Sequence, residues 1–119
     1  MHILFVESAY PNLKGEQGGA GTYVRNVGLE LIKRGHKVSV LRGGNHLIEH
    51  GFRIDQGIKV YSQKIKSNFA WYVCKTQVIN KLFFPLIQYL IVGLHKYIYI
   101  NIINNKDRID IIEYSSTGD

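Results

Sequence analysis

The sequence predicts an α/β protein with a doubly wound parallel sheet, and three observations support this. Residues 2–6 (HILFV) are apolar without alternation, which is typical of a parallel strand covered on both faces. Residues 19–34 repeat apolar side chains at helical spacing, and residues 37–41 (KVSVL) have the composition of a second strand. A strand, a glycine-rich loop, a helix and a strand indicate a right-handed βαβ crossover.

The helix predicted over residues 19–34 has clear internal signals. Its apolar positions form one stripe, at i, i+3, i+4, i+7 and i+8: Val24, Val27, Gly28, Leu31 and Ile32. Glu30 stands four residues before Arg34, the favourable order for a helical ion pair. Gly35 follows directly and can adopt the left-handed conformation that ends a helix. We therefore expect the helix to end at this glycine.

The remaining elements are less regular. Residues 42–57 are polar and rich in glycine, and we expect a long irregular connection there. A short third strand is expected over residues 58–61 and a fourth over residues 110–114. Residues 68–106 are helical in character, and Pro85 should kink this region or separate two helices. The loop after the fourth strand would line the ligand crevice of a doubly wound sheet, so we expect the domain to be incomplete at residue 119.

Composition sets the broad class. A chain of 119 residues fits one small domain or part of a larger one, and 45% hydrophobic residues exclude disorder and collagen-like structure. The single cysteine, Cys74, excludes an internal disulfide and favours a cytoplasmic protein. The N-terminal apolar run is too short for a signal peptide. Polar residues and Pro85 interrupt residues 82–103, so a helix buried against a sheet or lying on a membrane is expected there rather than a spanning helix.

The charge distribution suggests a further partner. The net charge is +6, and no acidic residue lies between Asp55 and Asp107. The lysines of this apolar stretch include Lys59, Lys64, Lys66, Lys75, Lys81 and Lys96. Such a segment is able to attract an anionic membrane surface, whereas a solvated lysine face on an ordinary helical layer is the alternative. We expect no nucleic acid partner.

A glycine-rich loop precedes the first predicted helix. Gly15, Gly18, Gly19 and Gly21 leave little side-chain bulk where the unpaired N–H groups of the helix begin, and such an end favours phosphate or carboxylate. The alternative is a loop whose glycines only permit tight turns. The dinucleotide fingerprint is excluded, because the glycines lie too far from the first strand, Val24 stands at the third glycine position, and Arg42 follows the second strand. A P-loop is excluded because no Gly-Lys-Ser/Thr follows.

Three segments resemble a known family: ILFVES-YP at the N-terminus, GGAGTYVRNVGLELIKRGHKVSVL, and DIIEY near the C-terminus. They are similar to the N-terminal domain of family 4-type glycosyltransferases, well over residues 1–41 and loosely over residues 107–119. The resemblance implies the first of two Rossmann-like domains of a GT-B architecture. It implies a retaining, hexosyltransferase-like enzyme of polysaccharide biosynthesis that transfers a sugar from a nucleotide-sugar donor to a saccharide or lipid-linked acceptor.

The resemblance also implies site residues. In the family, the corresponding loop approaches the diphosphate of the donor. The resemblance therefore implies that the donor diphosphate binds at Gly18, Gly19, Gly21 and Thr22. The candidate acceptor-binding residues are Tyr23, Arg25, Glu113, Ser115 and Asp119, although core packing for Tyr23 and an exposed helical position for Arg25 are alternatives. The donor-binding domain and its pair of glutamates are not in this sequence, so this chain alone is expected to be inactive and its catalytic residues cannot be placed.

Two alternatives complete the sequence-based predictions. A free-standing α/β module that binds small anions or a partner protein, without catalysis, is the rival to the glycosyltransferase. The inverted zinc-protease motif, H-x-x-E-H, occurs at His46, Glu49 and His50. Glycines on both sides leave this segment too short for a stable helix, and the sequence offers no evident third zinc ligand. We therefore expect no metal and no cofactor, the nucleotide-sugar being a co-substrate.

Overall fold

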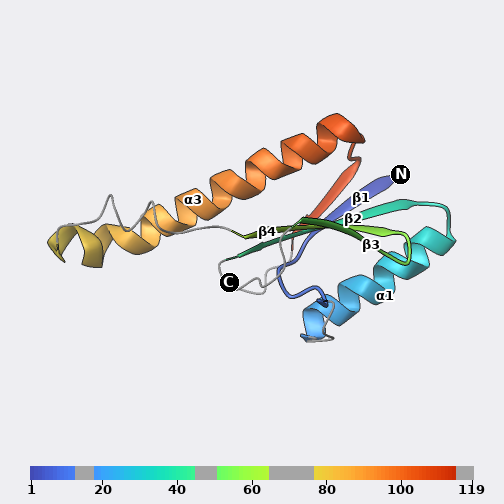
Figure 1. Cartoon of the computed structure of the whole chain (residues 1–119), viewed down its shortest axis with the longest axis horizontal. Coiled ribbons are helices and arrows are strands. Elements are labelled where there is room, and N and C mark those ends of the chain that lie inside the picture. The colour runs from blue at the N-terminus through green and yellow to red at the C-terminus, as the bar shows by residue number, and fades with distance from the viewer. Residues whose placement is uncertain (13–17, 45–50, 65–76, 115–119) are drawn as a thin grey trace.

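The computed structural model describes residues 1–12, 18–44, 51–64 and 77–114 (Figure 1). Its elements in chain order are β1 (His2–Val6), α1 (Gly19–Lys33), β2 (Lys37–Gly44), β3 (Gly51–Asp55), β4 (Ile58–Lys64), α3 (Gln77–Lys106) and β5 (Ile111–Tyr114). The strands form one five-stranded sheet in the order β3-β4-β2-β1-β5. Neighbouring strands are parallel except β3 and β4, which are antiparallel. The chain therefore folds as an α/β domain with a mostly parallel, mixed sheet.

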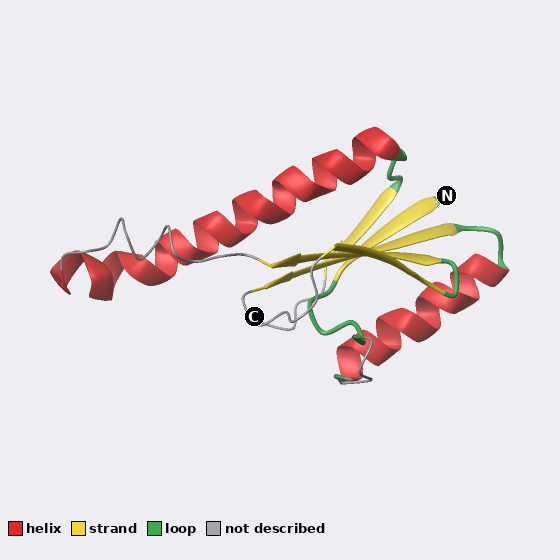
Figure 2. Ribbon diagram, in the orientation of Figure 1, coloured by secondary structure: helices red, strands yellow, loops and turns green. Residues whose placement is uncertain are grey.

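The two described helices lie on opposite faces of the sheet (Figure 2). Alternate residues of β1 divide between them: Ile3 and Phe5 belong to the apolar cluster under α1, whereas Leu4 and Val6 belong to the cluster under α3. Each of these four side chains is at most 7% exposed, and burying such a side chain contributes about 1.5–3 kcal/mol. The prediction that β1 is covered on both faces is confirmed.

The predicted first helix is confirmed almost to the residue. α1 ends at Lys33, and Gly35 has a φ of +84° while its N–H donates to the Ile32 carbonyl over 2.9 Å. The Glu30 carboxylate lies 3.5 Å from the Arg34 guanidinium. Both side chains are more than half exposed, so water screens this pair and it adds little stability.

The expectation of an irregular connection over residues 42–57 is wrong. β2 continues to Gly44, and Gly51–Asp55 forms an additional strand that pairs with β4 as a hairpin. The two turn residues, Gln56 and Gly57, have φ values of +49° and +96°, the positive pair that matches the twist of a tight hairpin. β4 is also longer than predicted, because it runs to Lys64 alongside the end of β2.

Of the two effects expected of Pro85, the separation of two helices is wrong, since α3 runs unbroken from Gln77 to Lys106; the expected kink stays a prediction. A proline inside a helix removes one backbone hydrogen bond and destabilises the helix by about 3 kcal/mol. A helix of 30 residues has enough other hydrogen bonds to form in spite of this cost. Residues 68–76 of the predicted helical region lie outside the described residues. The fourth predicted strand is confirmed as β5.

The polarity of α3 is unusual for a helix packed on a sheet. Lys96 is buried on the sheet side, at 9% exposure. The side chains on the outside are mostly apolar and 41–69% exposed: Leu86, Tyr89, Leu90, Leu94, Tyr97, Ile98 and Ile102. Among the described residues, no helix is both long enough and apolar enough to cross a membrane.

Candidate functional site

The strand order defines where a ligand crevice should lie. From β1 the chain passes through α1 to β2 on one side, whereas α3 later returns it to β5 on the other side of β1 (Figure 1). The direction of winding therefore reverses between β1 and β5. In open α/β sheets, ligands bind outside the carboxyl ends of the strands at such a reversal.

A cavity of about 240 Å³ lies at this place. Residues from the end of β1, the first turns of α1 and the end of β5 line it: Phe5, Val6, Glu7, Ala20, Tyr23, Val24, Glu113 and Tyr114. Phe5 pairs with Glu113 in the sheet register, and Val6 pairs with Tyr114. Cavities for drug-sized ligands measure about 300–1,000 Å³, so this cavity suits a smaller group, such as one sugar ring.

The N-terminus of α1 lies at the rim of the cavity. Its N-cap residue, Gly18, has extended backbone angles and provides no side-chain cap, and the first turn contains no acidic residue among Gly19–Thr22. The Thr22 hydroxyl donates to the Gly18 carbonyl over 3.2 Å. The first N–H groups of a helix have no acceptor within it, and such an end favours an anion.

The structure separates the predicted donor-binding glycines by their steric surroundings. A Cβ on Gly21 would lie 1.9 Å from the Ala9 carbonyl oxygen, so this glycine is required by the close approach of α1 to the loop after β1. A Cβ on Gly18 would make ordinary contact with Ala9 at 3.4 Å, and one on Gly19 would meet no atom of the described residues within 4 Å. Packing against the described residues therefore explains Gly21 but not Gly19.

A network of polar side chains holds the loop after β1 in place. The Tyr10 hydroxyl donates to the Asp55 carboxylate over 2.8 Å, and Arg25 Nε donates to the same oxygen over 2.9 Å. Arg53 donates to the Pro11 carbonyl, and its guanidinium lies 5.8 Å from the centre of the Tyr10 ring. The β3–β4 hairpin thus fixes both the loop and α1, which together form one wall of the cavity.

Ionisation in this network follows from its contacts. Burial opposes the charge on Asp55, but hydrogen bonds from Arg25 and Tyr10 outweigh it and lower the pKa of the carboxyl. Burial and the hydrogen bond to Asp55 raise the pKa of Tyr10. The hydrogen bond to Asp55 raises the pKa of Arg25. Asp55 is therefore charged and Tyr10 neutral near pH 7.

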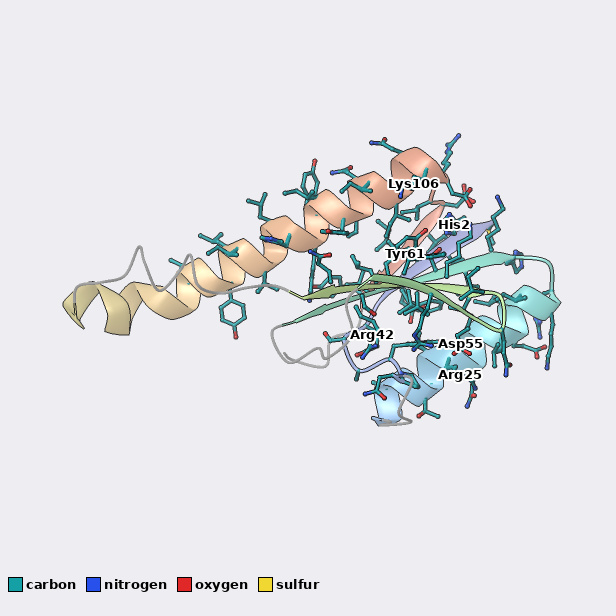
Figure 3. All side chains as sticks on the ribbon, viewed as in Figure 1. His2, Arg25, Arg42, Asp55, Tyr61 and Lys106 are labelled. Atoms are coloured by element: carbon teal, nitrogen blue, oxygen red, sulfur yellow. The ribbon has the colours of Figure 1, made fainter. Side chains whose placement is uncertain are left out.

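The structure places the predicted acceptor-binding residues in different positions relative to the cavity. Tyr23 and Glu113 both line the cavity. Arg25 does not line it, because its side chain is paired with Asp55 at the end of β3 (Figure 3). Ser115 and Asp119 lie outside the described residues. The structure thus brings together two of the five predicted side chains.

Sequence reasoning missed Glu7, which follows β1 directly and lines the cavity. This glutamate is only 3% exposed. Its Oε1 accepts a hydrogen bond from the Ala9 N–H over 2.8 Å, while Oε2 is buried without a hydrogen-bond partner in the described part of the chain. The available signal was an acidic residue at the carboxyl end of a buried strand, where ligand-binding side chains gather.

One lining residue, Tyr114, also contacts the helix on the opposite face of the sheet. The Lys96 ammonium of α3 donates to the Tyr114 hydroxyl over 3.0 Å and lies 5.2 Å from the centre of that ring. Lys59, another lysine of the predicted basic stretch, lies 3.4 Å from the Asp107 carboxylate. Lys59 and Lys96 therefore each have a partner within the chain.

Comparisons with protein-family models, with curated proteins and with solved structures give no match to this chain. The predicted zinc-protease motif, His46–His50, falls outside the described residues. Within the described ranges, no three His, Cys, Asp or Glu side chains gather in a way that could hold a metal ion. The fold and the cavity define an α/β domain with a small ligand-sized hollow at the reversal of its sheet.

Proposed function

We propose that this chain forms the acceptor-side, Rossmann-like domain of a GT-B glycosyltransferase that uses a nucleotide-sugar donor. In this proposal the enzyme is cytoplasmic and transfers a sugar to a saccharide or lipid-linked acceptor. The sequence resemblance suggests this class. The observation that carries it is the cavity between β1 and β5, which opens beside the uncapped N-terminus of α1.

The proposed site has two parts of different polarity. Backbone N–H groups at Gly18 and Gly19 favour the diphosphate of a donor, because they stand at the positive end of the helix dipole. Glu7 and Glu113 line the cavity itself and would repel a phosphate. An uncharged, hydroxyl-bearing acceptor fits the interior better, so donor and acceptor would lie side by side.

This arrangement matches the chemistry of sugar transfer. When the bond between the sugar and the nucleoside diphosphate breaks, negative charge grows on the leaving phosphate oxygen. Fixed N–H groups directed at that oxygen stabilise the charge in the transition state more than in the bound donor. The role proposed for α1 is therefore electrostatic, and it requires no side chain from Gly18, Gly19 or Thr22.

Attachment to an anionic membrane surface remains part of the proposal on sequence grounds. Lys59 and Lys96 do not support it, since Asp107 and Tyr114 engage them. Lysines at positions 64, 66, 75 and 81 would have to supply the attraction, and their side chains lie outside the described residues. The expected role is docking at the surface where lipid-linked acceptors are held.

An NMR titration with UDP, GDP and ADP tests the donor site. We expect at least one nucleotide to shift the amides of Gly18, Gly19 and Ala20, and Gly19→Val to weaken binding at least tenfold by blocking close approach of the phosphate. Gly93→Val is the matched control, because a Cβ there also meets no described atom within 4 Å but the site lies on α3.

Three results would contradict the proposal. They are the absence of binding by all three nucleotides, shifts that cluster away from α1, and unchanged affinity in Gly19→Val. Any of these would favour the free-standing α/β module that binds another small anion or a protein. Equal losses in Gly19→Val and Gly93→Val would point to a general effect of valine on the helices.

A further inference from the structure

A second cavity lies between α3 and the β3–β4 hairpin. Its volume is about 490 Å³, within the range of sites that hold drug-sized ligands. It shares no described lining residue with the cavity at β1 and β5. Tyr61 of the sheet and Lys106 of α3 approach it from opposite sides (Figure 3). The described residues that line it include no acidic side chain. This cavity is therefore a separate candidate site with its own chemistry.

Three of the side chains that line this cavity are aromatic. Phe52 and Tyr61 are direct partners in the β3–β4 register, so they lie on the same face of the sheet. Their ring centres are 5.0 Å apart and the ring planes are tilted by 49°, a favourable arrangement for an aromatic pair. Tyr61 and Tyr99 also pack against the apolar cluster under α3, which holds both rings in place. Since Phe52 remains 55% exposed, a flat molecule can reach its ring.

Lys106 brings a positive charge to the same cavity. It lies in the last turn of α3, where the helix dipole favours a cation. The next carboxylate in the sequence, Asp107, lies 3.2 Å from the Lys37 ammonium and 3.4 Å from the Lys59 ammonium. The Lys106 ammonium itself makes no hydrogen bond or ion pair with another residue in the described part of the chain. It is therefore available to an anion.

These features favour one of the ligand classes that stack on aromatic rings. A cation also binds to aromatic faces, but the Lys106 ammonium would repel it and no described lining carboxylate would offset that repulsion. A neutral sugar packs on aromatic side chains but leaves the ammonium without a counter-ion. We propose that this cavity binds a small aromatic carboxylate. The ring of the ligand packs against Phe52, Tyr61 and Tyr99, and its carboxylate accepts a hydrogen bond from Lys106. The site goes beyond the proposed function, because it requires neither a sugar nor a nucleotide.

Three naphthalene probes of similar shape test the role of charge by NMR titration: 1-naphthoate, 1-naphthalenemethanol and 1-naphthylmethylamine. Binding is followed by the amide shifts of Phe52, Tyr61, Gln63 and Tyr99. We expect the carboxylate to bind weakly, the alcohol about fivefold more weakly and the ammonium least of all, since one partly exposed ion pair has an effect of this size. D-glucuronate, an anion without an aromatic ring, should bind more weakly than naphthoate.

Lys106→Gln should lower the affinity for naphthoate about fivefold and leave the affinity for the alcohol unchanged. The unchanged binding of the alcohol also shows that the variant is folded. Lys33→Gln is the matched control, because Lys33 is the basic residue in the last turn of α1 and does not line this cavity. Tyr99→Leu should weaken the binding of all three naphthalene probes. Tyr97→Leu should not, since Tyr97 is 64% exposed and does not line the cavity.

Four results would overturn the proposal. The first is that no naphthalene probe shifts the amides around the cavity. The second is that the alcohol or the ammonium binds as tightly as the carboxylate, and the third is that Lys106→Gln binds naphthoate as tightly as the wild type. The fourth is a loss of affinity in Tyr97→Leu but not in Tyr99→Leu, which would place the binding on the outside of α3. Binding of D-glucuronate more tightly than naphthoate would replace the aromatic carboxylate with an acidic sugar and so refute the proposal as well.

These outcomes are distinct from those of the nucleotide titration. Shifts at Gly18 and Gly19 bear on the glycosyltransferase proposal alone, whereas shifts at Phe52, Tyr61 and Tyr99 bear on this cavity alone. Either proposal can therefore fail while the other stands.

Discussion

Gly21→Ala should be among the most destabilising single-methyl additions in this fold. The new Cβ would lie 1.9 Å from the Ala9 carbonyl oxygen, 2.5 Å from its carbon and 2.8 Å from the Tyr10 Cα. All three atoms belong to the backbone, so no side chain can rotate away and α1 must move relative to the loop. Overpacking costs about 1–3 kcal/mol or more, whereas replacing glycine by alanine inside a helix returns at most about 1 kcal/mol.

Two other glycines of α1 provide graded controls. At Gly28 the nearest atoms are side-chain methyls, Ile58 Cδ1 at 3.0 Å and Val38 Cγ1 at 3.3 Å, which can shift by a few tenths of an ångström. At Gly19 a methyl group meets no atom of the described residues within 4 Å. The free energy of unfolding should therefore be lowest for Gly21→Ala, intermediate for Gly28→Ala and unchanged or higher for Gly19→Ala. The net loss in Gly21→Ala should be about 1–2 kcal/mol or more.

Urea unfolding followed by circular dichroism measures these differences, with about 1–3 kcal/mol per molar as the usual slope for a small domain. A net loss of 1–2 kcal/mol then moves the midpoint by about 0.3–2 M. If Gly21→Ala were as stable as Gly19→Ala, the close packing of α1 on the Ala9 carbonyl would be refuted. The geometry of the cavity wall would then be wrong as well.

Two further predictions concern charge. Asp55→Asn should cost about 2 kcal/mol near pH 7, because it weakens the hydrogen bonds to Arg25 and Tyr10. Since the pKa of Asp55 is lowered in the folded state, its contribution is fully present above the unfolded value of about 4 and is lost as the pH falls through the folded value. Chemical unfolding between pH 6 and pH 2 should show that loss in the wild type and little of it in Asp55→Asn; equal pH profiles would contradict the assignment. For the membrane, Lys66→Gln with Lys75→Gln should weaken co-sedimentation with anionic vesicles, whereas Lys59→Gln should not, since Asp107 already engages it. Equal sedimentation with neutral and anionic vesicles would remove the membrane proposal.

The parts of the fold that sequence predicted are those set by local patterns. The unbroken apolar run of β1 and the stripe and glycine stop of α1 need no distant contact to be recognised. The β3–β4 hairpin was missed because its turn, Gln56-Gly57, lacks the usual Asn-Gly or Asp-Gly pair.

Missing the hairpin had a direct consequence for the predicted site. Asp55 ends β3 and binds Arg25, so without β3 this arginine had no internal partner and was assigned to a ligand. Glu7 could not be predicted for a related reason. Its burial and its place beside residues of α1 and β5 are tertiary features that are not encoded next to Glu7 in the sequence.

The exposed apolar side chains of α3 have a practical consequence for handling this chain in water. Large exposed apolar patches are uncommon on soluble monomers and promote association, and this helix presents Leu90, Leu94 and Tyr97 at 58–64% exposure. Samples should bind hydrophobic dyes without any denaturant, and their apparent mass should rise with concentration. Titrations at several protein concentrations, or with a little nonionic detergent, would distinguish this self-association from ligand binding.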